Sequence, residues 1–279
     1  MALKLMYITN NPQVALIAEK YGVDRVWIDL ETVGKEERQK NVDGVKSHHT
    51  IEDVKVMSKA LQKADLMVRI NPWGEYSKEE IEKVIEAGAK IVMLPMWKTL
   101  KEAQSFINAV NGRCKTVLLL ETKEGAEILD EVLENALPDE IHIGLNDLHL
   151  SYGLNFMFEL LANGTVESLC NKIKSKNIPY GFGGIARLGA GELKAEMVIK
   201  EHYRLGSTRA ILSRSFCDVE KANGLEEIEQ TFSKGLKELK DFENQLKEYK
   251  EEDFLLNKKE VEKITLQIAE IKKAKKSFL

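Results

Sequence analysis

Short apolar segments alternate with amphipathic segments over residues 1–219. The apolar segments are rich in aliphatic residues and end in polar residues or glycine, which is typical of buried strands. The segments between them place apolar residues at three- and four-residue steps, which predicts helices such as Pro12–Tyr21, Ile51–Lys63, Lys78–Ala87, Leu100–Val110 and Glu124–Leu133. The predicted strands are eight: Leu3–Ile8, Arg25–Leu30, Leu66–Ile70, Lys90–Leu94, Thr116–Leu120, Ile141–Ile143, Tyr180–Phe182 and Arg209–Leu212.

This alternation favours an α/β fold of the (β/α)8 TIM-barrel type. Strands that are apolar throughout and separated by helices indicate a parallel sheet covered by helices, and eight such units match a closed barrel. A doubly wound sheet is the main alternative, and it predicts a Gly-x-Gly-x-x-Gly turn after the first strand. Here Ile8 is followed by residues 9–12 without glycine, and the only glycine cluster, Gly181 to Gly184, lies at the seventh strand.

The last 60 residues have a different pattern. Residues 220–279 hold 13 Lys and 14 Asp or Glu, and apolar residues recur at helical spacing from Leu225 to Tyr249 and again from Val261 to Ile271. We therefore expect a barrel domain at 1–219 and a charged helical extension at 220–279. Each apolar stripe needs a partner surface, either this barrel or another subunit, and homo-oligomer assembly is the favoured role. A membrane or nucleic-acid role for Lys272 to Lys276 is the alternative.

Composition narrows the function classes. The 41 basic and 45 acidic side chains give a formal charge of −4, which offers no net attraction to nucleic acid or an anionic membrane. The three cysteines, Cys114, Cys170 and Cys217, include no Cys-x-x-Cys pair, so neither a disulfide framework nor a zinc site is indicated. No apolar run approaches the ~20 residues of a membrane helix. A cytoplasmic location is expected.

Candidate chemistry lies where the strands end. Active sites of such barrels form at the carboxyl ends of the strands. Asp29 and Glu31 end the second strand and point to the same side, Arg69 ends the third, Glu121 follows the fifth, and Asp147 follows the sixth. Each has a structural alternative, because Glu121 or Asp147 could cap a helix and Arg69 could only neutralise Asp29. Their joint placement on one rim favours a site.

Carboxylates gathered on one rim repel each other, and a divalent cation would relieve that repulsion. Oxygen ligands without paired His or Cys favour Mg²⁺ or Mn²⁺ over zinc. The Arg69 guanidinium offers a planar fork to a substrate carboxylate or phosphate. These residues predict a magnesium or manganese site that takes a small anionic substrate.

Five segments resemble successive motifs of the HpcH/HpaI aldolase and citrate lyase β-subunit family, which has a phosphoenolpyruvate-binding type of TIM barrel. They occur in the family's order over about residues 20–155. The turn at Gly183 and Gly184 and the Leu205-Gly206 turn agree more weakly. The five segments are DRVWIDLE at 24–31, VRIN at 68–71, GAKIVMLP at 88–95, LET at 120–122 and GLNDLHLSYG at 144–153.

The resemblance implies that Glu121 and Asp147 hold Mg²⁺ or Mn²⁺ and that Arg69 binds the carboxylate and enolate oxygens of a pyruvate-like or acyl unit. It also implies that the backbone around Gly144, Leu145 and Asn146 supports the substrate carboxylate. The cation would stabilise an enolate so that a neighbouring carbon–carbon bond can break or form. A metal-dependent lyase acting on a 2-oxo acid or an acyl-CoA is therefore the expected function.

Two departures from the family pattern leave the base open. Thr32 stands where the pyruvate-aldolase branch usually has a His, and Leu119 stands where that branch commonly has a Gln. The citrate-lyase branch typically has Asp-Leu-Glu-Asp, whereas this chain has Asp-Leu-Glu-Thr at 29–32. His48 and His49 are candidates to replace the missing imidazole, and His149 is a weaker one.

Three basic residues follow strands four, seven and eight and could bind the anionic remainder of a larger substrate. These residues are Lys98, Arg187 and Arg214. A phosphorylated or sugar-derived oxo acid is therefore an alternative substrate. A non-catalytic assembly protein that keeps the barrel is an alternative from another class, which the replacements Thr32 and Leu119 motivate.

Overall fold

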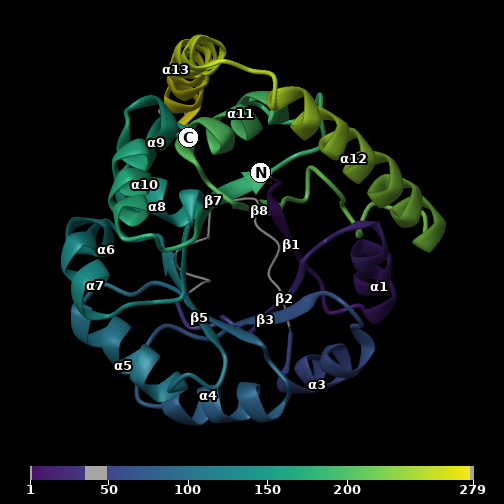
Figure 1. The fold of residues 1–279 in the computed structure, drawn as a ribbon, viewed down its shortest axis with the longest axis vertical. Helices are drawn as coiled ribbons and strands as arrows, with labels where there is room; N and C mark the ends of the chain where they lie inside the picture. Colours follow the sequence, from purple (N-terminus) through teal and green to yellow (C-terminus); the bar gives the residue numbers. More distant parts are fainter. Residues whose placement is uncertain (1, 35–48, 277–279) are drawn as a thin grey trace.

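Eight parallel strands close into a barrel in the computed structural model, which describes residues 2–34 and 49–276 (Figure 1). The strands follow one another around the barrel in chain order, and β8 pairs with β1. The predicted TIM-barrel fold is confirmed. The strands are β1 (Lys4–Ile8), β2 (Arg25–Asp29), β3 (Asp65–Arg69), β4 (Ile91–Leu94), β5 (Lys115–Leu120), β6 (Glu140–Ile143), β7 (Tyr180–Ile185) and β8 (Arg209–Leu212).

Helices form a ring outside the strands (Figure 1). Several begin at side-chain caps that the sequence supplies: Asn11 caps α1, and Thr50 and Thr99 form capping boxes at α3 and α5. The helices are α1 (Pro12–Tyr21), α3 (Ile51–Ala60), α4 (Ser77–Glu86), α5 (Leu100–Val110), α6 (Lys123–Glu127), α7 (Leu129–Asn135), α8 (Leu145–Ser151), α9 (Glu159–Ala162), α10 (Thr165–Ser175), α11 (Ala195–Leu205), α12 (Leu225–Leu246) and α13 (Glu251–Lys276).

Alternate residues of the strands fill the barrel interior. One apolar cluster inside the barrel includes Met6, Trp27, Met67, Met93 and Leu119, all nearly inaccessible to solvent. The residues between them point outward and pack against the helices in a second, larger cluster. Because both faces of each strand are buried, the strands are apolar throughout, as the sequence pattern predicted.

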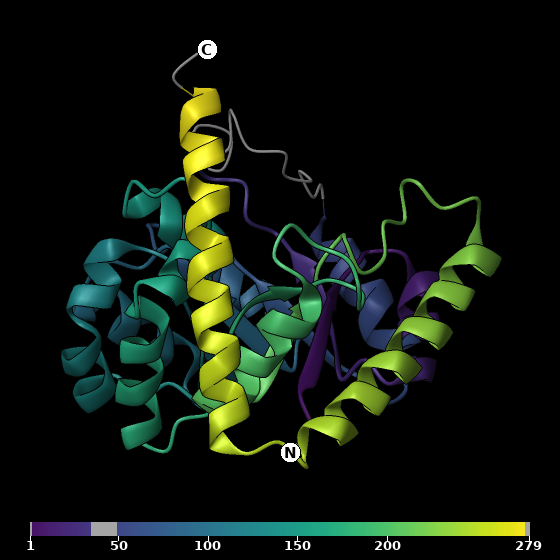
Figure 2. The same cartoon turned by 90° about the horizontal axis from the view of Figure 1, so that it is seen from above.

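The two C-terminal helices both find a partner surface on this chain. Helix α12 packs beside α1, and its Phe232 ring meets the Tyr7 ring edge-on at 5.0 Å and lies 5.9 Å from the Phe216 ring. Helix α13 packs against α9 and α11, where the Asn257 side chain donates to Glu201 at 2.9 Å. Helix α12 therefore completes the ring of helices after β8, and α13 lies outside it (Figures 1 and 2).

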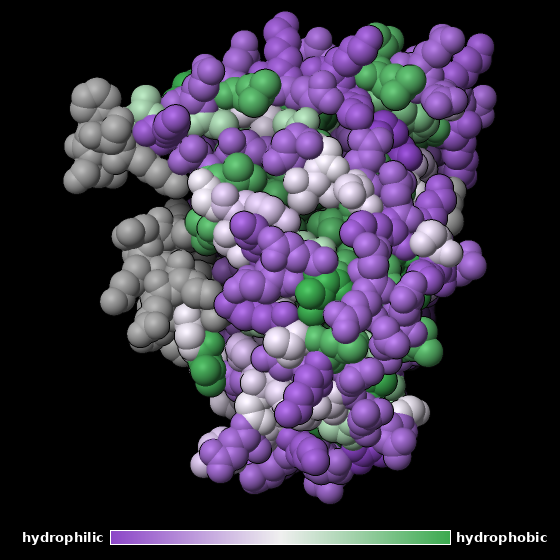
Figure 3. Space-filling model, turned by 90° about the vertical axis from the view of Figure 1, so that its left-hand side faces the viewer, coloured by the Kyte–Doolittle hydropathy of each residue, from purple (hydrophilic) through white to green (hydrophobic). Residues whose placement is uncertain are grey.

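The face of the molecule in Figure 3 is predominantly polar. Figure 3 shows one face, on which apolar surface occurs in separate patches between hydrophilic residues. Helix α13 nevertheless keeps large apolar side chains in solvent, namely Leu255, Leu256, Leu266 and Ile271. Within the described ranges, no helix has the length and apolar character required to cross a membrane.

An ion-pair network closes the amino-terminal end of the barrel. The Glu140 carboxylate accepts two hydrogen bonds from Arg25, both at 2.6 Å, and two from Arg209, at 2.7 and 3.1 Å. The side chains come from the first residues of β2, β6 and β8, which face inward. Burial alone would raise the Glu140 pKa, but the two guanidinium groups hold it at about 2.

Candidate active site

Four of the predicted site residues lie at the carboxyl ends of β2, β3 and β5, at the end of the barrel opposite to this network. Asp29, Glu31 and Glu121 are each almost completely buried, and Arg69 has a side chain that is 11% exposed. The register pairs Asp29 on β2 with Arg69 on β3, so the two side chains leave neighbouring strands at the same height. The rim that the sequence predicted is thus present, and it is closely packed.

Asp29 and Glu31 hold the Arg69 side chain from two sides. Arg69 donates from Nε to Asp29 Oδ1 at 2.9 Å and from Nη2 to Oδ2 at 2.8 Å, and its Nη1 lies 3.3 Å from Glu31 Oε2. Burial alone would lower the pKa of Arg69, but the carboxylates of Asp29 and Glu31 raise it above its usual value. The guanidinium carbon also lies 5.0 Å from the centre of the Trp27 ring. Arg69 is therefore a fixed, permanent cation.

Glu121 has a strongly perturbed carboxylate. Burial raises its pKa well above the usual value, and the nearby Asp147 carboxylate raises it further, while Arg69 opposes both effects. Asp147 lies in the first turn of α8, near enough for its charge to affect the Glu121 pKa. Two neighbouring carboxylates in a buried site repel each other when both are ionised. A bound cation is therefore favourable at such a site.

The backbone around Glu121 is adapted to that carboxylate. The Met96 N–H donates to Glu121 Oε1 at 3.1 Å. Met96 has a φ of 54°, a left-handed conformation that is costly for a residue with a side chain. On the other side, a Cβ atom added at Gly144 would lie only 2.9 Å from Glu121 Oε2. Glycine at 144 thus keeps open the space beside the second carboxylate oxygen.

The donor set fits a hard divalent cation. Glu121 and Asp147 offer carboxylate oxygens, and the space at Gly144 lies directly against one of them. In the described part of the chain, no three His, Cys, Asp or Glu residues converge closely enough to hold a metal alone. Two carboxylates completed by water and substrate oxygens is the arrangement that Mg²⁺ commonly uses. The residues therefore fit Mg²⁺ or Mn²⁺ and do not resemble a closed zinc site.

Of the two histidines proposed as a base, one is at the rim. The His49 Nδ1 accepts a hydrogen bond from the Asp29 N–H at 3.0 Å, so the neutral ring carries its proton on Nε2. His48 lies outside the described residues. Asn71 Oδ1 accepts from the Thr32 and Val33 N–H groups at 2.9 and 3.0 Å, which fixes the backbone just after Glu31.

Helix α8 presents its first turn to the same end of the barrel. Gly144 is its N-terminal cap, and Leu145 and Asn146 are its first two residues, whose N–H groups have no acceptor within the helix. The His149 ring turns back, with Nδ1 donating to the Leu145 carbonyl at 3.2 Å. His149 is thus engaged with its own helix. Gly183 of β7, with a φ of 52°, packs so closely on Leu145 that a Cβ there would lie 2.7 Å from Leu145 Cδ1.

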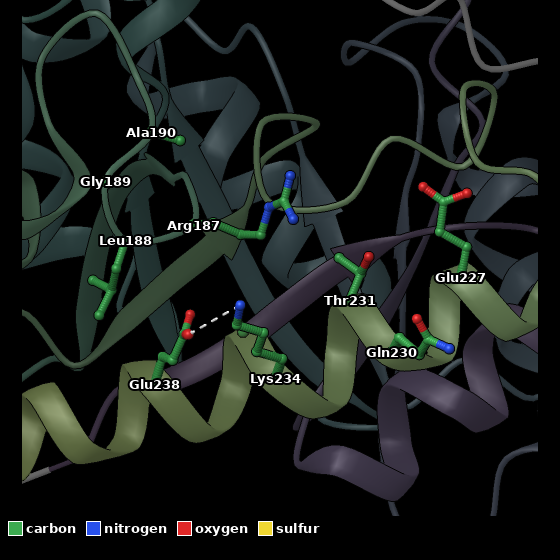
Figure 4. A pocket seen from close by; sticks show the side chains of 10 residues that line it. Arg187, Leu188, Gly189, Ala190, Glu227, Gln230, Thr231, Lys234 and Glu238 are labelled. Atoms are coloured by element: carbon green, nitrogen blue, oxygen red, sulfur yellow. Dashed lines mark ion pairs between the residues drawn. The ribbon is translucent and has the colours of Figure 1, made fainter.

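The three predicted anion-binding residues do not converge. Lys98 pairs with Glu124 at 2.9 Å in solvent, and Arg214 is exposed beyond β8. Arg187 lies after β7 and lines a pocket of about 540 Å³ between the 187–190 segment and α12. Figure 4 shows Arg187 with Thr231 and Lys234 of α12 in this pocket, and Lys234 lies 3.9 Å from Glu238. This pocket does not include the carboxylate rim.

Met96 and Trp27 are features of the site that sequence reasoning does not reveal. The apolar pattern shows Trp27 only as a strand residue and Met96 only as part of a connection after β4. The one available signal for Met96 is its position after Pro95 at a strand end, which does not indicate a left-handed backbone.

The buried carboxylate rim and its fixed arginine lie at the carboxyl ends of the strands, where enzymes of the TIM-barrel class have their active sites. The comparison with family models then gives the family. The HpcH/HpaI aldolase/citrate lyase model matches residues 4–157, more than half of the chain, so the protein belongs to the HpcH/HpaI aldolase/citrate lyase family. This membership indicates an aldolase-type lyase, and the family is generally dependent on a divalent metal.

Solved structures support the fold. An HpcH/HpaI aldolase from Desulfitobacterium hafniense DCB-2 is similar with a TM-score of 0.59 and 14% identity, over 86% of this chain and 93% of that one. An HpcH/HpaI aldolase/citrate lyase family protein from Burkholderia cenocepacia J2315 gives 0.60 and 13%, over 81% and 95%. A variant of tryptophan synthase from M. tuberculosis, in its ligand-free form, gives 0.57 and 13%, over 84% and 92%. No curated protein matches the sequence.

Proposed function

We propose that the protein is a divalent-metal-dependent carbon–carbon lyase that acts on a 2-oxo acid of the pyruvate type, or on an acyl-CoA. The observation that carries the proposal is the buried Glu121 carboxylate, whose pKa is raised by burial and by Asp147 within a rim that also holds Arg69. Burial of such a cluster of charges lowers the stability of the fold. A bound cation and an anionic substrate give the cluster a function.

Glu121 and Asp147 would hold the metal. When bound, Mg²⁺ or Mn²⁺ acts as a Lewis acid on the substrate carbonyl and lowers the energy of the enolate. Oxygen ligands from the substrate fit the space that Gly144 leaves beside Glu121 Oε2. The Met96 N–H contact at Oε1 keeps the Glu121 carboxylate oriented toward that space.

Arg69 binds and orients the substrate. A guanidinium carries five N–H groups, and the contacts with Asp29 and Glu31 use three of them. The remaining two can donate to a carboxylate or to the oxygen on which negative charge develops. Because Asp29 and Glu31 fix the group in advance, little reorganisation is needed when the charge appears.

His49 is the proposed proton-transfer group. Its Nδ1 is engaged with the Asp29 N–H, so Nε2 is the atom at which the ring gives or takes a proton. Thr32 stands where the pyruvate-aldolase branch usually has a His, and its hydroxyl is not suited to the role of a base. In this assignment the His49 imidazole takes that role. The N–H groups of Leu145 and Asn146 would support the substrate carboxylate, as the family resemblance predicts.

The proposal is tested with the purified protein and two reactions: decarboxylation of oxaloacetate, and condensation of pyruvate with a panel of aldehydes. Each is followed with Mg²⁺, with Mn²⁺ and with EDTA, and metal binding is measured by calorimetry. Turnover that depends on the added metal is the expected result. Absence of both turnover and metal binding would exclude a metal-dependent lyase.

The two alternatives from the sequence have distinct outcomes in the same experiment. Metal binding without any turnover would favour a non-catalytic assembly protein. Turnover restricted to phosphorylated or sugar-derived oxo acids would favour the biosynthetic alternative. The observation that bears on the latter is Arg187, a cation after β7 that lines a pocket together with Lys234, Glu227 and Glu238.

A further inference from the structure

A second pocket lies at the amino-terminal end of the barrel, away from the carboxylate rim. It has a volume of about 380 Å³ and is formed where β1, the end of α10 and β8 meet. In Figure 2 this is the end at which β1 begins, near the N label and the turn between α12 and α13. The site proposed above uses none of its residues.

The lining of this pocket is one-sided in charge. Lys4, Lys174 and Arg209 all contribute to it, and its lining contains no Asp or Glu. Lys4 and Lys174 are exposed, and neither has a salt bridge in the described part of the chain. The nearby basic residues on α10 and just beyond it are different, because Lys172 pairs with Asp130 and Lys176 pairs with Glu134.

Arg209 lines the pocket and also belongs to the buried ion-pair network with Glu140. Its Nε and Nη2 donate to Glu140, while Nη1 points to the Thr208 hydroxyl, which also lines the pocket. Arg25 uses the same Glu140 carboxylate. Two guanidinium residues that are 1% and 8% exposed thus share one carboxylate, so this network of three side chains carries one more positive than negative charge. Uncompensated buried charge is costly, and an anion in the adjoining pocket would offset it.

A further acidic group near the amino-terminal end of the barrel is engaged elsewhere. Glu243 of α12 accepts from the Leu3 N–H at 2.8 Å and from the Tyr203 hydroxyl at 3.0 Å, and it does not line the pocket. The remaining lining residues are uncharged and include Asn177, Pro179 and Tyr180. The volume exceeds that of a single phosphate group, so a phosphate could be bound together with a small organic part.

We infer that this pocket binds a phosphate-bearing small molecule, with Lys4, Lys174 and the Thr208–Arg209 pair as the phosphate-recognising groups. Three cations from three separate segments suit a polyvalent anion better than a single carboxylate. Since catalysis in barrels takes place at the opposite end of the strands, this site binds a ligand other than the reacting substrate. The inference does not depend on the proposed lyase activity.

The test is a titration of the full-length protein with inorganic phosphate and with pyrophosphate, followed by calorimetry and by ³¹P NMR. We expect saturable binding, tighter for pyrophosphate. In Lys4→Ala and Lys174→Ala the affinity for pyrophosphate should fall about tenfold each, since each removes a charge-assisted contact. Both residues are exposed, so these substitutions should leave the core unchanged, which equal melting temperatures of the variants and the wild type would verify.

Two matched variants decide where the anion binds. Lys176→Ala removes a cation just beyond the same helix that is already paired with Glu134, and it should leave the affinity unchanged. Arg214→Ala removes a cation at the opposite end of the barrel and should also have no effect. No saturable binding, equal losses in Lys174→Ala and Lys176→Ala, or loss of binding in Arg214→Ala alone would each overturn the inference.

Discussion

Arg69 and Asp29 stand opposite each other on β3 and β2 and form a two-pronged ion pair, with Nε–Oδ1 and Nη2–Oδ2 distances of 2.9 and 2.8 Å. The pair could be only structural, because two neighbouring strands need their buried charges neutralised. Two further observations argue for a site. Glu31 adds a second carboxylate to the same arginine, and Glu121 beyond it has a pKa that burial and Asp147 raise. A cation bound by Glu121 and Asp147 would offset the repulsion that raises this pKa.

The shape of the Arg69 guanidinium is the first property to test. In Arg69→Lys the charge remains but the two-pronged geometry is lost, so we expect turnover to fall by roughly 10²–10³ while substrate binding weakens less. Steady-state kinetics of metal-dependent oxaloacetate decarboxylation measure this. The matched control is Arg113→Lys, which alters a similar two-pronged pair with Glu82 on the surface. Equal rates in the wild type and Arg69→Lys would refute the assigned role.

The metal assignment is tested by removing one charge at Glu121. Glu121→Gln keeps an oxygen that can accept from the Met96 N–H but removes a carboxylate ligand. We expect Mn²⁺ affinity to fall by more than about a hundredfold and metal-dependent turnover to disappear. The exposed Glu124, paired with Lys98, provides the control Glu124→Gln. Calorimetry and Mn²⁺ electron paramagnetic resonance measure the affinity, and unchanged binding would show that the metal lies elsewhere.

The same carboxylate predicts a pH dependence of stability in metal-free protein. The folded-state pKa of Glu121 is raised above its usual value by burial and by Asp147, so the native state holds this proton more tightly than the unfolded state. Its contribution to stability is present below about pH 4.5 and is lost as the pH rises through the raised pKa. Thermal unfolding in EDTA should show this loss in the wild type, whereas Glu121→Gln should lack it and added Mn²⁺ should reverse it.

The sequence predicts most of the fold because its determinants are local. The predicted and observed bounds coincide for Pro12–Tyr21, Leu100–Val110 and Arg209–Leu212, where apolar periodicity and flanking caps agree. The predicted helix at 124–133 is interrupted at Ile128, so it forms α6 and α7. The predicted seventh strand stops at Phe182, although β7 continues to Ile185, because glycines 183 and 184 resemble a strand terminator.

The features that the sequence does not reveal depend on closure of the barrel. The predicted sixth strand omits Glu140, because a charged residue is not expected inside. Glu140 lies inside because Arg25 and Arg209, 115 and 69 residues away in the chain, meet it there. The left-handed Met96 is likewise invisible in a pattern of apolar and polar positions. The rim itself was predictable, since strand ends of a parallel barrel must converge.

A buried histidine predicts the acid stability of the barrel. His142 of β6 donates from Nε2 to the Gly183 carbonyl, and burial lowers its pKa from 6.5 to about 4. A depressed folded-state pKa means that stability is lost as the pH falls from about 6.5 toward 4, by about 3 kcal/mol for this group. His142→Gln keeps a donor and cannot be protonated, so its stability should vary less over this range. Urea unfolding between pH 4 and 7 measures the difference, and parallel curves for both proteins would contradict it.

Substitutions in the two C-terminal helices should have different effects: on stability for α12 and on assembly for α13. Truncation after Val219 tests assembly poorly, because it also removes Phe232, which packs on Tyr7 and Phe216 inside the ring of helices. Phe232→Ala alone should lower the free energy of unfolding by roughly 3–5 kcal/mol.

On α13, by contrast, Leu255 and Leu266 are 45% and 57% exposed, and a separation of 11 residues puts them on the same helix face.

We propose that this face of α13 contacts a second copy of the chain. Replacing both residues, Leu255→Glu with Leu266→Glu, should shift the molecular mass measured by light scattering toward the monomer without lowering the melting temperature of the barrel. Lys259→Glu reverses one charge on the same face, one turn from Leu255, and keeps both leucines, so its effect on the mass separates a change of charge from the loss of apolar contacts. A mass unchanged in the double variant would exclude this face as the interface, because two buried carboxylates could not be accommodated there without partners.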